Sequence, residues 1–132
     1  MRKFTQTAAA LISLSVLFVG TSIAESGNSV GAGTFKGASD HVTTGGVTVF
    51  TTPKSGTVVI LDTDFSLDGA PDPGVGFGID GKYDPSSDLG KLKQVNGLQA
   101  YVVPDKVKAS KYNEVYIWCR KFSVPLGVAK LR

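Results

Sequence analysis

The residue with the most distinctive chemistry is Cys119, the only cysteine of the chain, in the segment VYIWCRKF directly after the only tryptophan, Trp118. A thiol can be oxidised, can ligate a metal or haem iron, or can pack as a small buried side chain. Arg120 and Lys121 follow it, and basic neighbours are typical of reactive cysteines. Two interpretations therefore stay open, a redox or ligand-binding thiol and a thiol that only fills the core.

The only histidine, His41, is the second candidate for ligand or proton chemistry. A blue-copper site needs two histidines and a cysteine, and structural zinc needs four ligands, so we predict no metal site. The C-x-x-C-H motif of covalent haem is absent. Haem held without a covalent bond through Cys119 or His41, with Trp118 beside it, is compatible with the sequence. No feature of the sequence requires a cofactor.

The remaining motifs argue against common enzyme classes. The segment 62–74, DTDFSLDGAPDPG, carries four aspartates but lacks the spacing of a calcium-binding EF-hand loop, so we interpret it as turn chemistry. The sequence has no G-x-S-x-G, no H-E-x-x-H and no phosphate-binding glycine loop. We therefore do not expect a stand-alone enzyme, and leave open a redox role alongside a partner protein.

The first 24 residues have the pattern of a secretory signal peptide. Arg2 and Lys3 precede an apolar stretch at 8–19, and Ser22 and Ala24 place small residues before a cleavage site. The apolar stretch is shorter than the roughly 20 residues that span a bilayer. We predict cleavage after Ala24 and an exported protein, periplasmic or extracellular, with no membrane span after cleavage.

Signal removal also changes the charge balance. It takes two of the 14 basic side chains, which leaves 12 against 11 acidic ones in a mature chain of 108 of the 132 residues. This nearly neutral chain gives no electrostatic reason to expect a nucleic-acid partner. Its length fits one domain with one core.

The elements that must position these residues are short strands. After a flexible linker predicted at 25–32, runs rich in valine, threonine and aromatic residues alternate with glycine and proline. We predict strands at 34–36, 46–51, 57–61, 75–79, 98–103, 115–120 and 126–131. The pattern indicates one all-β domain over 33–132, an antiparallel sandwich or barrel. The segment 104–113 is interpreted as a solvated connection with room for one helical turn.

The last but one of these strands determines how Cys119 is placed. Side chains alternate between the two faces of a strand, so Val115, Ile117 and Cys119 share one face. That face is apolar and is expected to point into the core. Tyr116 and Trp118 lie on the opposite face, which is either covered by a loop or is a surface platform.

These residues together resemble the DM-thirteen family, the electron-transfer domain found beside DOMON domains. The elements that carry the resemblance are Gly33-Thr34-Phe35, His41, Gly45-Gly46, Phe65, Gly69-Ala70-Pro71-Asp72, Leu89-Gly90-Lys91-Leu92, Gly97-Leu98-Gln99-Ala100-Tyr101, Pro104, Tyr112, Val115-Tyr116-Ile117-Trp118-Cys119, Phe122, Gly127, Ala129 and Leu131. The terminal W-C-x-x-F-x-V-x-x-G-x-A-x-L arrangement is distinctive when it is joined to G-x-Q-x-Y-x-x-P.

The resemblance implies a compact β domain whose single cysteine, here Cys119, is a redox thiol or binds a prosthetic group such as haem. Ala70 departs from the G-P-D turn of the family. No haem-binding neighbour accompanies the domain in this sequence, so the resemblance implies a separate redox partner protein in the cell envelope. The alternatives are a non-enzymatic envelope-binding or structural module with Cys119 as buried core, and a small-ligand binder with a β cavity.

Overall fold

The computed structural model describes residue 15 and residues 27–132, in which ten strands and two short 3-10 turns are found. The predicted signal peptide therefore lies almost entirely outside the described residues. The strands are β1 (Asn28–Gly37), β2 (Thr43–Thr44), β3 (Gly46–Thr52), β4 (Gly56–Leu61), β5 (Ser66–Leu67), β6 (Pro73–Ile79), β7 (Lys82–Asp84), β8 (Gln99–Val102), β9 (Glu114–Cys119) and β10 (Val124–Lys130). The turns are η1 (Pro85–Ser87) and η2 (Ala109–Lys111).

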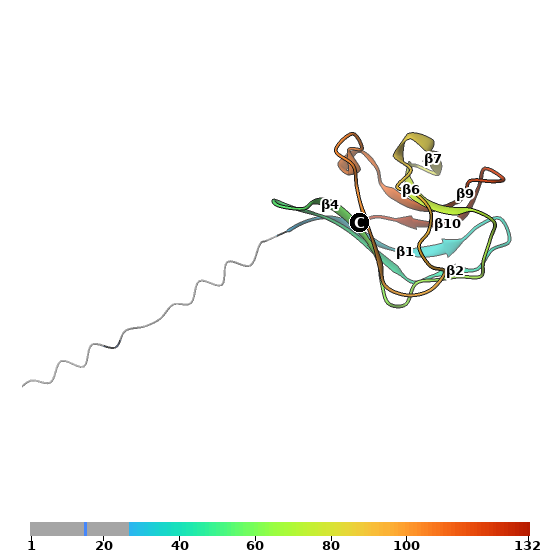
Figure 1. Ribbon diagram of the computed structural model, residues 1–132, viewed down its shortest axis with the longest axis horizontal. Helices are drawn as coiled ribbons and strands as arrows, with labels where there is room; N and C mark the ends of the chain where they lie inside the picture. The colour runs from blue at the N-terminus through green and yellow to red at the C-terminus, as the bar shows by residue number, and fades with distance from the viewer. Residues whose placement is uncertain (1–14, 16–26) are drawn as a thin grey trace, which may run out of the picture.

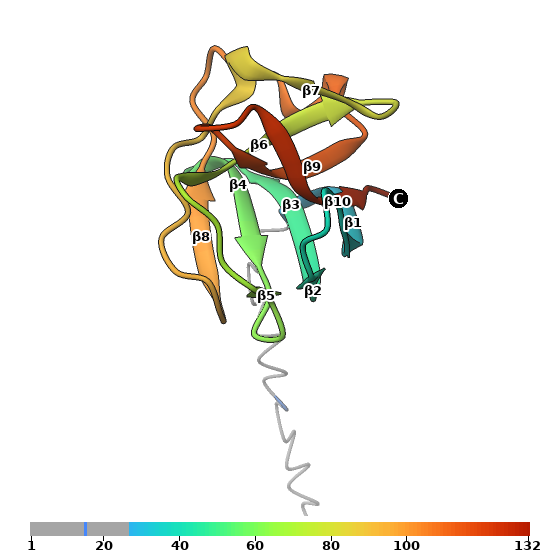
Figure 2. The same cartoon turned by 90° about the vertical axis from the view of Figure 1, so that its right-hand side faces the viewer.

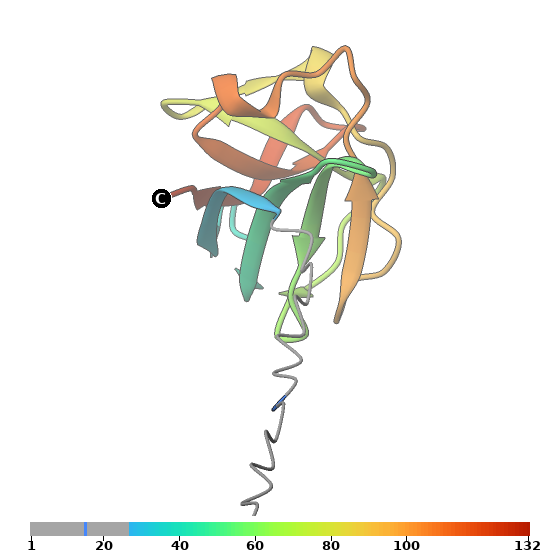
Figure 3. The same ribbon diagram turned by 90° about the vertical axis from the view of Figure 1, so that its left-hand side faces the viewer.

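Eight strands form one antiparallel sheet in the order β7-β6-β9-β10-β1-β3-β4-β8. The sheet is curled, so that its two ends face each other across the interior (Figures 2 and 3). The end strands β7 and β8 do not pair with each other, which leaves an open half-barrel. The prediction of an all-β antiparallel domain is confirmed.

Strand β1 joins the two halves of this sheet (Figure 1). Its first part pairs with β3, from Asn28 opposite Thr51 to Thr34 opposite Gly46. Its last residues pair with β10, beginning with Phe35 opposite Ala129. Because one strand changes partner along its length, the sheet bends there and the halves pack face to face as in a sandwich.

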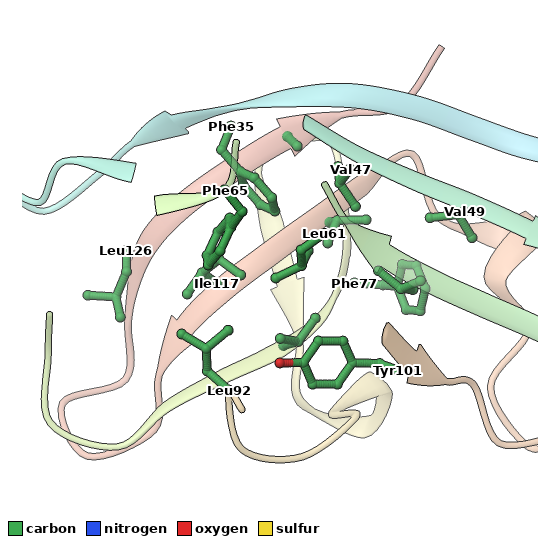
Figure 4. Packing of buried hydrophobic residues seen from close by; sticks show 14 of the residues in the cluster. Phe35, Val47, Val49, Leu61, Phe65, Phe77, Leu92, Tyr101, Ile117 and Leu126 are labelled. Carbon is green, nitrogen blue, oxygen red and sulfur yellow. The ribbon is translucent and has the colours of Figure 1, made fainter. Parts of the chain in front are cut away.

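The interior is filled by one cluster of buried side chains from both halves (Figure 4). Alternate residues of each strand point inward, as the two-residue period requires. The labelled members include Phe35, Val47, Leu61, Phe77 and Ile117. The short pair of strands β2 and β5 lies at one end of the interior, where Phe65 and Leu67 join the cluster and the Phe65 ring meets that of Phe35 edge to face.

The strand predictions hold, with differences at the ends and in the shortest elements. Each of the seven predicted strands corresponds to an observed one, but β1 begins at Asn28, inside the linker predicted at 25–32. Pairing with β3 is what makes these polar, glycine-rich residues extended. Strands β2, β5 and β7 were not predicted, because two or three residues show no alternation. The connection at 104–113 contains η2, and its Val107 and Ala109 are buried.

Replacing Ile117 with alanine is expected to lower the free energy of unfolding by about 2–5 kcal/mol, because the side chain is fully buried at the middle of β9 and would leave a cavity. The matched control is Val102→Ala on β8, where the side chain is 70% exposed and the change should stay within about 0.5 kcal/mol. Urea unfolding followed by tryptophan fluorescence measures both. Equal losses in the two variants would contradict the packing described here.

Candidate functional site

Cys119 lies at the last position of β9, on the face that points into the core. It is 1% exposed and belongs to the buried cluster with Val115 and Ile117, as the alternation predicts. Its neighbours across the sheet are Pro73 on β6 and Val124 on β10. The thiol donates a hydrogen bond to the carbonyl oxygen of Pro71, with Sγ and O 3.2 Å apart.

Residues 71–73, which we call the cap segment, lie against this thiol and are bonded to Arg120, the residue that follows Cys119. The backbone N–H of Arg120 donates to the carbonyl oxygen of Asp72 at 3.1 Å, and its Nη2 lies 2.8 Å from the Asp72 carboxylate. Asp72 has a positive φ of 47°, a conformation that aspartate tolerates better than most residues. The guanidinium also reaches Asp88, with Nη1 and Oδ2 3.4 Å apart.

The electrostatics of the cap segment follow from this contact. The hydrogen bond from Arg120 lowers the pKa of the Asp72 carboxyl, and the same bond raises the pKa of Arg120. Both side chains are partly exposed, so the pair contributes little to overall stability. The pair instead holds the turn at Asp72 in place, and with it the carbonyl oxygen of Pro71, which accepts the hydrogen bond from the thiol.

His41 has a partner of its own on a different loop. Its Nδ1 lies 2.9 Å from the carboxylate of Asp68, which also accepts the backbone N–H of Val42 at 3.0 Å. The Val42 bond and then the His41 bond lower the pKa of Asp68. Within residues 27–132 no hydrogen bond or ion pair joins His41 to Cys119. The structure therefore assigns the two residues separate contacts.

Trp118 faces away from Cys119 and takes part in an aromatic trio, which we define as Tyr83, Tyr116 and Trp118. The rings of Trp118 and Tyr83 are stacked, with centroids 4.2 Å apart and planes at 15°. Tyr116 lies 5.6 Å from Tyr83 and 6.3 Å from Trp118. Of the two alternatives for this face, covering by another segment is what the structure shows, and the covering strand is β7.

The glycines of β6 make room for the trio. Its inward residues are Val75 and Phe77, while its outward positions include Gly76 and Gly78. A Cβ at Gly76 would lie 2.7 Å from the Tyr83 ring, and one at Gly78 would overlap the Tyr116 ring. The rings of Tyr83 and Tyr116 therefore lie over a strand that has no side chains at these two positions.

Glu114, at the start of β9, was not predicted as a site residue. It is 2% exposed, and its carboxylate accepts the hydroxyl of Tyr116 at 3.2 Å and the backbone N–H of Gly81. Burial, together with the charge of Glu114 and the hydrogen bond to it, raises the pKa of Tyr116 to about 12. The sequence E-V-Y at 114–116 could have indicated this contact, because residues two apart share a face of a strand.

The described residues offer no cluster of metal ligands, and the thiol of Cys119 does not fit a haem. No group of three or more histidine, cysteine or acidic side chains among them could hold a metal ion. Haem binding through Cys119 would need its sulfur, which is buried and already donates a hydrogen bond to the carbonyl oxygen of Pro71. Four hollows on the described surface are lined by residues other than Cys119 and His41. The residues present therefore do not fit a haem at this thiol.

The fold and site define a small antiparallel β domain with one buried, capped thiol. A protein-family model described as "Electron transfer DM13" matches residues 34–131, and the chain belongs to this family. The resemblance of the sequence to the DM-thirteen family is thereby confirmed. No curated protein and no solved structure matches the chain. In the part of the chain that the structure describes, no helix has the length and hydropathy to cross a membrane.

Replacing Asp72 with asparagine should make Cys119 react several-fold faster with thiol reagents in the native protein. The substitution keeps the positive-φ turn, since asparagine also tolerates it, but weakens the contact with Arg120. Asp68→Asn, which breaks the pair with His41 instead, is the matched control and should leave the rate unchanged. Equal rates in wild type and Asp72→Asn would show that this contact does not control access.

The same contact predicts a pH dependence. Because the folded-state pKa of Asp72 lies below its ordinary value of 3.8, the contact is fully present above pH 3.8 and is lost as the pH falls through the lowered pKa. Labelling with dithiodipyridine, which stays reactive in acid, should therefore accelerate below pH 3.8 in wild type. Asp72→Asn should lack this acceleration.

Proposed function

We propose that the protein is an electron-transfer domain whose redox-active group is the thiol of Cys119. The observation that carries the proposal is the thiol's position, in a family described as electron transfer, under a cap segment that the adjacent Arg120 holds in place. Cys119 is also the only cysteine available. A covered thiol is protected from indiscriminate oxidation and reacts only when the cap segment moves.

The chemistry of a single thiol limits how the electrons move. No second cysteine exists in the chain, so an intramolecular disulfide is not available. A peroxide oxidant converts the thiol to a sulfenic acid, with cleavage of the O–O bond and release of an alcohol or water. Two thiols of a partner protein then return the sulfenic acid to the thiol, forming one disulfide and one water. The proposed partner is therefore a dithiol protein of the cell envelope.

Burial of Cys119 favours one competing function. With 1% exposure and a hydrogen bond to Pro71, the thiol also fits a structural role in a non-enzymatic envelope module. The two functions differ in whether the native thiol reacts. The third alternative, a ligand inside the β structure, gains no support from an interior filled by the core cluster (Figure 4).

Treating the native protein with peroxide in the presence of dimedone should trap a sulfenic acid on Cys119, detected as an adduct by intact mass spectrometry. Reduced thioredoxin, added in place of dimedone, should restore the thiol. Cys119→Ala, which keeps a small side chain in the core, is the control and should form no adduct. Adduct formation only after addition of denaturant would overturn the redox proposal and establish the structural role.

We also propose that the protein is exported and cleaved between Ala24 and Glu25. Support comes from the basic start, the apolar stretch at 8–19 and the small residues at Ser22 and Ala24. Intact mass measurement of the secreted or periplasmic protein should show an N-terminus at Glu25. Ala24→Leu should accumulate the uncleaved precursor, because a large side chain does not fit the position before the cut. A full-length chain beginning at Met1 in the soluble exported fraction would contradict cleavage.

A further inference from the structure

The outward face of β9 carries a second arrangement, which the thiol chemistry does not use. We propose that Tyr116 is a one-electron redox site that passes an electron through the aromatic trio to an oxidised metal centre of a partner protein and its proton to Glu114. The inference rests on the proposed electron-transfer function, but it does not depend on Cys119 as the reacting group.

The proton transfer is set up by the contact between Tyr116 and Glu114. The phenol donates its hydrogen to Glu114 Oε2 at 3.2 Å, and both residues are 2% exposed. A phenol with a pKa of about 12 is protonated at neutral pH, so its oxidation requires a nearby base. Loss of one electron turns Tyr116 and the Glu114 carboxylate into a neutral tyrosyl radical and a carboxylic acid. The electron lowers the oxidation state of the partner's metal by one. An electron from a reduced donor then converts the radical back to tyrosine, and the proton returns from Glu114.

The electron has a short route to the surface. Tyr116 contacts Tyr83 and Trp118, whose rings are stacked on each other. Tyr83 is buried, whereas Trp118 is half-buried and reaches solvent. Trp118 is therefore the member of the trio at which a partner can exchange an electron.

The surroundings of Tyr116 suit a radical that must last until it is reduced. Its ring lies on Gly78 and is shielded from solvent, which limits side reactions. Glu114 lines a surface hollow together with Gly81, Asn113 and Lys130. The residue that receives the proton therefore lies beside a hollow that is open to solvent.

The test is photochemical oxidation of the full chain by flash-generated tris(bipyridine)ruthenium(III), with the radical identified by electron paramagnetic resonance. Wild type should give a neutral tyrosyl signal, and Tyr116→Phe should lose it. This variant and its control are both made in a Tyr112→Phe background, because Tyr112 also donates to a carboxylate, that of Asp84 at 2.6 Å, but is not part of the aromatic trio. The control is Tyr101→Phe, in which the signal should persist because Tyr101 donates to the neutral amide of Gln99. Glu114→Gln keeps the phenol and should reduce the yield, and Trp118→Phe should slow radical formation.

The outcomes separate this inference from the thiol proposal. A signal that survives in Tyr116→Phe, or a yield unchanged in Glu114→Gln, would overturn the role of the pair. Thermal unfolding of each variant establishes that it is folded. If Tyr116→Phe does not fold, the radical yield of Glu114→Gln still tests the role of the pair. A tyrosyl signal in Cys119→Ala together with an unreactive native thiol would support the inference and refute only the redox role of Cys119.

Discussion

The antiparallel pairing of β9 with β6 on one side and β10 on the other is the constraint on which the site depends. A strand held on both edges cannot rotate, so its alternating side chains are committed to opposite faces. Val115 and Ile117 then lie in the core, and Tyr116 and Trp118 lie outside it. The burial of the thiol and the assembly of the aromatic trio are two results of the same pairing.

Covering the outer face of β9 in turn explains features of its neighbours. Tyr116 would be an exposed aromatic residue without β7, whose Tyr83 lies over Trp118 and reaches Tyr116. Tyr83 can extend across β6 only because Gly76 has no side chain beneath the ring. The hairpin of β6 and β7 is thus adapted to β9, although the hydrophobic core alone would not require it.

Local pattern was sufficient to predict much of this arrangement. The two-residue period in 115–119 predicts which side chains face the core, and valine-rich runs between glycines predict the strands. The prediction stops where an interaction joins residues far apart in the chain. Nothing near Arg120 in the sequence indicates Asp72, and nothing near Trp118 indicates Tyr83. Glu114 is predictable only in part. Its place beside Tyr116 follows from the alternation along β9, but its burial depends on the turn at Gly81, which is distant in the sequence.

The aspartate-rich segment at 62–74 is another place where the sequence predicts the local structure but not the long-range contacts. Its composition predicts turns, and the carboxylates bind protein donors: Asp64 accepts the N–H of Gly46, Asp68 binds His41 and Val42, and Asp72 binds Arg120. Each of these contacts ties the segment to a different strand or loop. One segment therefore holds His41 at one point and caps Cys119 at another, which explains why two residues of interest can depend on the same loop without meeting. At the end of the segment, Asp72 meets Arg120, the residue after Cys119, through an ion pair between partly exposed side chains and through a backbone hydrogen bond. An exposed ion pair of this kind contributes little to stability, so this end of the segment is the part nearest the thiol that is least firmly held.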